Sequence, residues 1–346
     1  MTKEIGWLLE VLRGEAPVGV DWVALMALAR AQGVLGLVWE AVERDAVLAA
    51  SMPVEVKLAW WGNVRAVEDA LRRKREVSAD YARQLLPLRC VVLKGVDYAR
   101  RWPNALHREY GDLDHFSGED FDAVNARLGE LGVATTDNGY KHSHADFGGV
   151  PVENHRFLTG FAGSPQGRRI ELVLQELLAG PTERIDGTDL LSPCASFTAL
   201  FMLLHAQRHF LNHGVTLRHI FDWIFFLRHD CDKVDWEVFG RYAYELGVMP
   251  WARVVTAFAI ERLGLEESLV KFDYEPPREG AVEQFARDIF SPHDRDGERH
   301  WWMKLGRVCR GFVRKWRFRE YLLMPYWRSV WTTIAYSSYL HRKPKP

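Results

Sequence analysis

A stretch with the pattern of β-strands lies between two long stretches with the pattern of helices. Between residues 87 and 180, short β-branched runs alternate with turn residues, and one amphipathic segment spans 117–132. The expected order is strand, helix, strand, helix and then three strands, with turns at 138–139 and 148–149. A last strand that runs into a helix is expected within 168–178. The sequence therefore predicts an α+β fold, in which a small mixed β-sheet is flanked by N- and C-terminal helical regions.

The flanking stretches have the 3.6-residue apolar period of helices. Asp21 is a predicted N-cap, Gly33 a predicted helix stop, and a long amphipathic helix is expected from Val54 to Leu86. The charged residues 72–76 of that helix are expected on a solvated face. We expect four successive parts: a helical region 1–86, an α/β core 87–180, a helical region 190–265 and a basic tail 266–346.

The end of the chain differs from the rest in charge. Residues 300–346 contain eleven Lys or Arg and a single acid, Glu320, so this segment is about +10 while the whole chain is −1. Tryptophans are interleaved with the basic residues. Such a segment can contact a polyanion such as nucleic acid or a membrane surface, or it can pack as a helical cap on the acidic body of its own chain.

Cysteine usage and hydropathy limit the class of protein. The four cysteines lie far apart without a C-x-x-C pair, which argues against a structural zinc site and a disulfide framework. The N-terminal residues lack the apolar run of a signal peptide, and no window approaches the ~18 apolar residues of a membrane span. We therefore expect a cytoplasmic protein with no transmembrane segment.

The sharpest chemical feature is the run Gly111-Asp112-Leu113-Asp114. Residues two apart on a strand project to the same face, so Asp112 and Asp114 are expected side by side. Two adjacent carboxylates repel each other unless a cation lies between them. Mg²⁺ prefers such oxygen ligands, and two Mg²⁺ ions can hold the attacking and leaving oxygens in phosphoryl transfer. The pair indicates a metal site, although two solvated acids at a strand end would have the same sequence.

The segment before this pair carries residues suited to phosphate. Lys94 and Gly95 follow a β-branched run, and a glycine turn into a helix leaves backbone N–H groups free to face phosphate. Arg108 lies four residues before Asp112, where it can reach a triphosphate or pair with an aspartate. The alternative to a phosphate contact is that Lys94 and Arg108 are simply exposed on the surface.

These motifs together resemble a known family. The segment VVLKGVDYARRWPNALHREYGDLDHF resembles the signature of the uncharacterised bacterial nucleotidyltransferase family, in which L-K-G is followed by a short helix, an Arg and then G-D-[IL]-D. Similarity continues upstream in WVALMALARAQGVLGLVWEAV and downstream in PVENHRFL, LFMLLHAQRHF and GVTLRHIFDWIFFL. It covers residues 20–260 and leaves the tail after 265 outside.

The resemblance implies a polymerase-β-like core that binds an NTP as substrate with two Mg²⁺ ions and transfers a nucleotidyl group to an acceptor. Gly95 matches the turn glycine that holds the triphosphate, and Lys94 and Arg108 are the other candidate nucleotide-binding residues. Asp112 and Asp114 match the catalytic, metal-binding pair. Lys94-Gly95 stands where the wider superfamily has Gly-Ser, and His115 follows Asp114 where small aliphatic residues are commoner.

The family's third metal-binding acid has two candidates. Glu153 in PVENHRF is preferred, and Glu171 in RRIELVL is the alternative. His155 lies on the same face as Glu153 and is expected either to contact substrate or to be a hydrogen-bonded structural residue. A member of the fold that binds a nucleotide or a partner without catalysis is the alternative function.

Two helical pairs complete the set of candidate residues. His205 and His209 share one helix face, and their position in the family suggests the wall of the substrate cleft rather than a zinc site, since no H-E-x-x-H motif is present. Arg218 and Asp222 have the same spacing and are expected to form a salt bridge.

Overall fold

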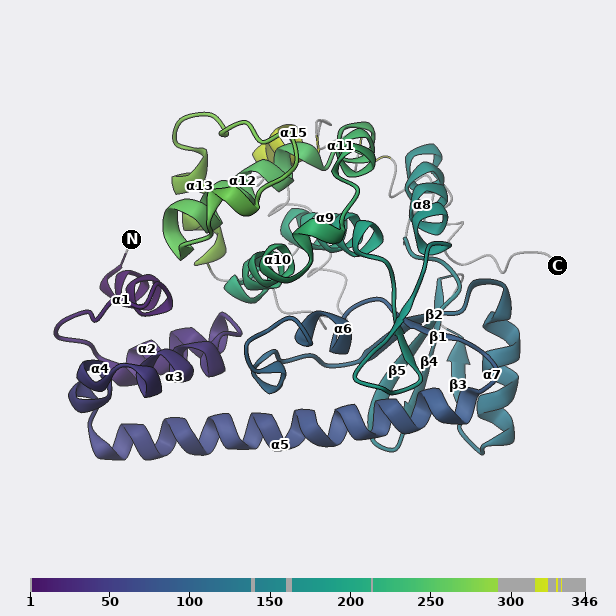
Figure 1. The fold of residues 1–346 in the computed structure, drawn as a ribbon, viewed down its shortest axis with the longest axis horizontal. Coiled ribbons are helices and arrows are strands. Elements are labelled where there is room, and N and C mark those ends of the chain that lie inside the picture. Colours follow the sequence, from purple (N-terminus) through teal and green to yellow (C-terminus); the bar gives the residue numbers. More distant parts are fainter. Residues whose placement is uncertain are drawn as a thin grey trace.

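The computed structural model describes residues 2–137, 141–159, 164–212, 214–291 and 315–322, together with 328 and 331. Within these ranges, helices flank one mixed sheet (Figure 1). The predicted α+β fold is therefore confirmed. The turn predicted at 138–139 and most of the tail 300–346 lie outside the described residues. The four-part division of the chain stays a prediction.

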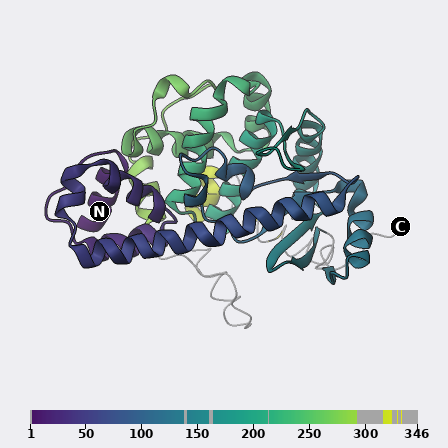
Figure 2. The same cartoon turned by 60° about the horizontal axis from the view of Figure 1, so that its bottom comes forward.

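The N-terminal region is helical. The side chain of Asp21 accepts hydrogen bonds from the N–H groups of Val23 and Ala24 and thus caps a helix, as predicted. Helix α5 runs along most of the length of the molecule, from the group α1–α4 to the sheet (Figures 1 and 2). The bounds are α1 Lys3–Leu12, α2 Trp22–Ala31, α3 Leu35–Arg44, α4 Ala46–Ser51 and α5 Val54–Leu85.

Seven strands form the sheet in the order β3-β4-β5-β2-β1-β7-β6. Strand β2 lies antiparallel to β1 and parallel to β5, β1 and β7 are parallel, and the remaining neighbours are antiparallel. The centre of the sheet therefore joins the two strands that carry the candidate acids. The bounds are β1 Cys90–Val92, β2 Leu113–Phe116, β3 Thr135–Asp137, β4 His142–Phe147, β5 Val150–His155, β6 Glu183–Arg184 and β7 Leu190–Ser192.

Short helical elements connect the central strands. Between β1 and β2 lie helix α6 (Val96–Ala99) and the 3-10 turn η1 (Ala105–His107). After β2 come the 3-10 turn η2 (Gly118–Asp120) and helix α7 (Phe121–Glu130), which leads to β3. This is the predicted order up to the end of β5.

The strand predicted within 168–178 is wrong, because this segment belongs to helix α8 (Pro165–Leu178). The hydroxyl of Ser164 caps the helix by accepting the N–H of Gly167 at 2.9 Å. The buried residues Gly167, Glu171 and Leu174 recur with helical spacing. Strands β6 and β7, which the sequence analysis does not predict, complete the sheet.

The C-terminal region is helical and shares a core with the N-terminal helices. One cluster of buried apolar side chains includes residues of α1–α3, of α9–α13 and Trp102, and a second cluster surrounds the sheet. The bounds are α9 Ala195–Asn212, α10 Leu217–Asp230, η3 Cys231–Lys233, α11 Trp236–Glu245, α12 Met249–Leu263, η4 Glu267–Leu269, α13 Ala281–Ile289 and α15 Lys315–Tyr321.

The described part of the basic tail, α15, packs on α9. The side chain of Arg317 is fully buried, donates to the carbonyl oxygen of Phe210 and lies over the ring of that residue. Gln207 Nε2 donates to the carbonyl oxygen of Tyr321 at 2.6 Å. These contacts agree with the helical-cap interpretation for this segment. None of the described helices has the length and apolar character to cross a membrane.

Candidate functional site

The three candidate carboxylates lie together at the centre of the sheet. Asp112 precedes β2, Asp114 lies within β2, and Glu153 is the residue opposite Asp114 in the parallel neighbour β5. Each offers a carboxylate oxygen, and these oxygens lie within 4.8 Å of one another. The side chain of Asp114 is 1% exposed, whereas those of Asp112 and Glu153 are 32% and 20% exposed. The structure thus brings together all three acids that the sequence analysis names as metal ligands.

Lys94 is the counter-ion of the aspartate pair. Its Nζ lies 2.7 Å from Asp114 Oδ2 and 3.4 Å from Asp112 Oδ1. Burial lowers the pKa of Lys94, but the two aspartates outweigh burial and the net shift of the pKa is upward. The ammonium group is therefore charged and bridges the two acids.

The three carboxyl groups differ in pKa. Burial raises the pKa of Asp114, but Lys94 and His155 outweigh burial and hold it well below its ordinary value. Burial and then the charge of Asp114 raise the pKa of Asp112. Burial also acts to raise the pKa of Glu153, yet the hydrogen bond with His155 makes the net shift downward. Lys94 forms ion pairs with the two aspartates, and the charge of Lys141 acts on Asp114 and Glu153. The three carboxylates together offer the oxygen ligands that a divalent cation prefers.

Gly95 forms the turn after β1. Its φ is 66° and its ψ is −108°, a backbone conformation that residues with a Cβ rarely adopt. A Cβ at this position would lie 3.2 Å from Tyr110 Cδ2 and 3.3 Å from the carbonyl oxygen of Asp112. The turn therefore packs closely against the segment that carries the aspartate pair, where the resemblance places the triphosphate.

Lys74 supports the loop before the aspartate pair, although the sequence analysis assigns it to a solvated face. Its Nζ donates to the carbonyl oxygens of Tyr110 and Gly111, at 2.6 and 2.8 Å, and lies 5.3 Å from the centre of the Tyr110 ring. Burial lowers its pKa, and the nearby Asp112 opposes that shift. The helical period shows which face carries this lysine but not where its long stem reaches.

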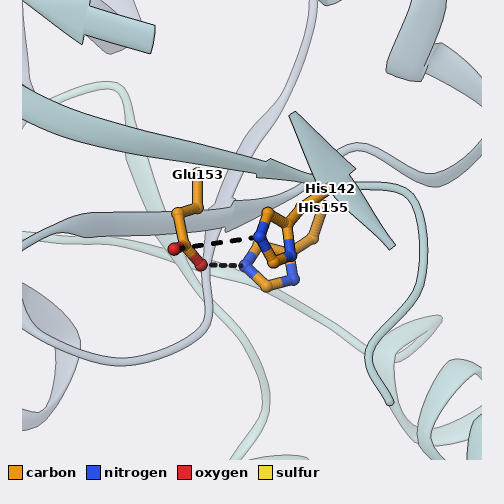
Figure 3. A group of neighbouring side chains, drawn as sticks. All are labelled: His142, Glu153 and His155. Carbon is orange, nitrogen blue, oxygen red and sulfur yellow. Dashed lines mark hydrogen bonds and ion pairs between the residues drawn. The ribbon is translucent and has the colours of Figure 1, made fainter. Parts of the chain in front are cut away.

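Three histidines surround Glu153. In the antiparallel pair β4–β5, His142 is opposite His155 and His144 is opposite Glu153. His155 Nε2 lies 3.2 Å from both Asp114 Oδ1 and Glu153 Oε2. His142 and His155 both point toward Glu153 (Figure 3). The sequence analysis does not single out His142 and His144, and their only signal is the spacing of two residues on a strand.

His205 and His209 on α9 form a histidine cluster with α10. Their ring centres are 4.5 Å apart, and the ring of His209 is 5.8 Å from that of His219. Burial lowers the pKa of His205 well below its ordinary value, and the charges of His209 and Lys94 add to that shift. Because the charges of Lys94 and Asp114 both act on His205, this cluster lies near the carboxylates. A contact with substrate stays a prediction.

Arg108 has a partner far away in the sequence. Its Nε and Nη2 donate to the two carboxylate oxygens of Asp222 at 2.9 and 2.7 Å, and Trp102 Nε1 donates to the same carboxylate. The predicted salt bridge of Arg218 with Asp222 is wrong, since Arg218 instead donates to the carbonyl oxygen of Glu109 at 2.9 Å. Nucleotide binding by Arg108 stays a prediction, and its buried ion pair favours a structural role.

Glu171, the alternative third acid, lies on helix α8 and is buried. Its carboxylate accepts hydrogen bonds from the N–H groups of Leu158 and Thr159, at 3.0 and 2.9 Å. These bonds hold the segment after β5 in place. Among the described residues, the carboxylate group around the aspartate pair contains Glu153 and not Glu171.

His115, which departs from the superfamily pattern, is part of the core. Its side chain is fully buried, and its Nε2 lies 2.8 Å from the hydroxyl of Tyr81 in α5. Burial lowers its pKa to about 3, so the ring is neutral. Because adjacent residues of a strand face opposite sides, His115 points away from the face of Asp114. A histidine at this position therefore leaves the acid pair intact.

Comparison with known proteins gives one match. A family model described as an uncharacterised nucleotidyltransferase matches residues 19–264, which confirms the resemblance inferred over residues 20–260. No curated protein and no solved structure matches the chain. The matched range includes the carboxylates, Lys94, Gly95 and the histidine cluster.

Proposed function

This chain belongs to the family of uncharacterised nucleotidyltransferases, and on that premise we propose that it transfers a nucleotidyl group from an NTP to an acceptor hydroxyl with Mg²⁺ as cofactor. The observation that carries the proposal is the register of β2 and β5, which sets Asp114 opposite Glu153 beside Asp112. Nucleotidyl transfer by metal ions needs such a set of carboxylates on a rigid support.

The residues at the site fit magnesium. Mg²⁺ is usually held by one or two carboxylates together with substrate phosphates and water. Asp112 and Glu153 are partly exposed, so a substrate can reach them, and each offers a carboxylate oxygen near that of the buried Asp114. The three acids would hold the metal, which when bound neutralises charge on the phosphates and lowers the pKa of the acceptor hydroxyl.

The groups of the chain itself orient the reactants. The Gly95 turn and Lys94 lie beside Asp112, where backbone N–H groups and an ammonium group can face the triphosphate. A carboxylate oxygen of the acid set takes the proton of the acceptor hydroxyl. The bond from that hydroxyl oxygen to the α-phosphorus then forms as the bond to pyrophosphate breaks.

Binding of each NTP, measured by calorimetry with and without Mg²⁺, tests the proposal. We expect Mg²⁺-dependent binding of at least one NTP by the wild type, and its loss in Asp112→Asn/Asp114→Asn, because that variant removes two of the three ligands. Pyrophosphate release in the presence of hydroxyl-bearing acceptors then separates an enzyme from a non-catalytic nucleotide-binding protein. A folded wild type that binds no NTP would overturn the proposal.

Lys74→Met is expected to lower the rate of transfer by about 10- to 100-fold, because the two carbonyl groups that position Asp112 lose their donor. Circular dichroism should show a folded protein. The matched control is Arg73→Met, whose side chain is exposed on the same helix and whose rate should equal that of the wild type. Equal rates for both variants would show that Lys74 does not position the loop.

A further inference from the structure

We propose that His142, Glu153 and His155 form a binding site for a transition-metal ion. The site shares Glu153 with the carboxylate set but takes its other ligands from β4 and from the end of β5. It does not depend on nucleotidyl transfer, because a resident ion at these residues needs no nucleotide.

The spacing of the ligand atoms suits one small ion. The three residues each offer a ligand atom, and these atoms lie within 4.8 Å of one another. His155 Nε2 is 3.2 Å from Glu153 Oε2, and His142 Nε2 is 3.9 Å from Glu153 Oε1 (Figure 3). Around a four-coordinate ion with bonds of ~2.0–2.1 Å, ligand atoms lie about 3.3 Å apart. Small side-chain rotations therefore close the site around an ion, while the paired strands keep the backbone in place.

The ring nitrogen of His155 that faces away from Glu153, Nδ1, has a contact typical of metal-binding histidines. It lies 3.4 Å from the carbonyl oxygen of Phe157. When a metal ion binds Nε2 of a neutral imidazole, the ring proton lies on Nδ1, which here faces the carbonyl oxygen of Phe157. The ion would take the place between Nε2 and the two carboxylate oxygens that a hydrogen bond holds in its absence. Histidines that bind metal usually donate their other N–H to a carbonyl or carboxylate group in this way.

His142 and His144 bring two ring nitrogens together beside Glu153. Nε2 of His142 lies 2.9 Å from Nε2 of His144 and 3.9 Å from Glu153 Oε1. His144 Nδ1 lies 3.6 Å from Glu153 Oε1, so this ring is placed to serve as a further ligand.

The ligand types favour a transition metal over magnesium. Imidazole nitrogen suits zinc, iron, nickel and copper, whereas Mg²⁺ takes oxygen ligands. Two histidines and one carboxylate form the ligand set of several catalytic zinc and non-haem iron sites. We therefore expect the histidine site to keep its ion in excess Mg²⁺, while the oxygen-only set of Asp112, Asp114 and Glu153 remains the magnesium site.

Titration of metal-stripped full-length protein with Co²⁺, without nucleotide, tests this site through the visible absorption of the ion. We expect one equivalent to bind with the bands of a nitrogen-containing site, and excess Mg²⁺ to leave them unchanged. His142→Gln should weaken Co²⁺ binding by at least about 100-fold, since even the loss of a supporting group around a metal ligand costs 10- to 100-fold. His229→Gln, which changes a half-exposed histidine on α10, should bind like the wild type.

Asp112→Asn separates this site from the proposed magnesium site, and it should retain Co²⁺ binding because Asp112 is no ligand here. Crystals of the wild type grown with Zn²⁺ should show anomalous scattering between His142, Glu153 and His155, which tests the site without any substitution. Absence of that peak, or unchanged Co²⁺ binding in a folded His142→Gln variant, would overturn the proposal. Loss of Co²⁺ binding in Asp112→Asn would assign the ion to the carboxylate set instead.

Discussion

Glu153→Gln is expected to slow nucleotidyl transfer by at least about a thousandfold, which corresponds to about 4 kcal/mol of activation free energy. Glutamine keeps the shape of the side chain but loses the negative charge opposite Asp114 and beside His155. Bound metal ions contribute several kcal/mol to stabilising the transition state of such reactions. Pyrophosphate release at saturating NTP and Mg²⁺ measures the effect.

Glu171→Gln is the matched control, because it makes the same chemical change at the alternative acid. Here the lost charge weakens hydrogen bonds from two backbone N–H groups, so we expect the free energy of unfolding to fall by about 2–3 kcal/mol. The rate of nucleotidyl transfer per folded molecule should equal that of the wild type. The opposite result, with transfer lost in folded Glu171→Gln and kept in Glu153→Gln, would make Glu171 the third acid.

The acid pair is predictable from the sequence because Asp112 and Asp114 stand two residues apart, at and just before the start of strand β2. The alternation of a strand alone is enough to place both side chains on one face. Glu153 is different, because its position beside Asp114 depends on β5 pairing with β2, and the local pattern does not specify that strand order. The resemblance to the family leaves Glu153 and Glu171 as candidates, and the parallel register gives the geometric reason to prefer Glu153.

Segment 168–178 shows where a local pattern misleads. Its β-branched and apolar residues fit a strand, but a short apolar run cannot be told from a buried helix by composition. The cap at Ser164 and the recurrence of buried residues in the helical period decide the outcome. Strands β6 and β7 are only two and three residues long, too short to leave a periodic signal.

Long side chains are the least predictable part of the site. Helical periodicity places Lys74 on a charged face, yet its four-carbon stem reaches the carbonyl groups of the loop before Asp112. Arg108 meets Asp222, which no spacing rule connects with it. Such contacts depend on tertiary packing, so only the structure shows that Lys74 and Arg108 have their partners inside the protein.

Arg108→Met is expected to lower the free energy of unfolding by about 3–5 kcal/mol, the usual cost of breaking a buried ion pair from one side. The side chains of Arg108 and Asp222 are 5% and 3% exposed, so the carboxylate left behind stays out of water with the N–H of Trp102 as its remaining described donor. Urea unfolding, analysed by midpoint and slope, measures the loss.

Two further variants test whether the unpaired charge of Asp222 causes the loss of stability. Arg72→Met removes an exposed ion pair with Asp69 and should change stability by less than about 1 kcal/mol. Arg108→Met/Asp222→Asn should regain most of the loss, because asparagine carries no charge and its oxygen still accepts the N–H of Trp102. A double variant no more stable than Arg108→Met would show that lost packing, not the unpaired charge, causes the loss of stability.

The NTP affinity of folded Arg108→Met tests the nucleotide-binding role that the motif predicts for this arginine. A fall of tenfold or more would make Arg108 a nucleotide ligand. An unchanged affinity would leave it a structural role, in which it links the loop before Asp112 to α10.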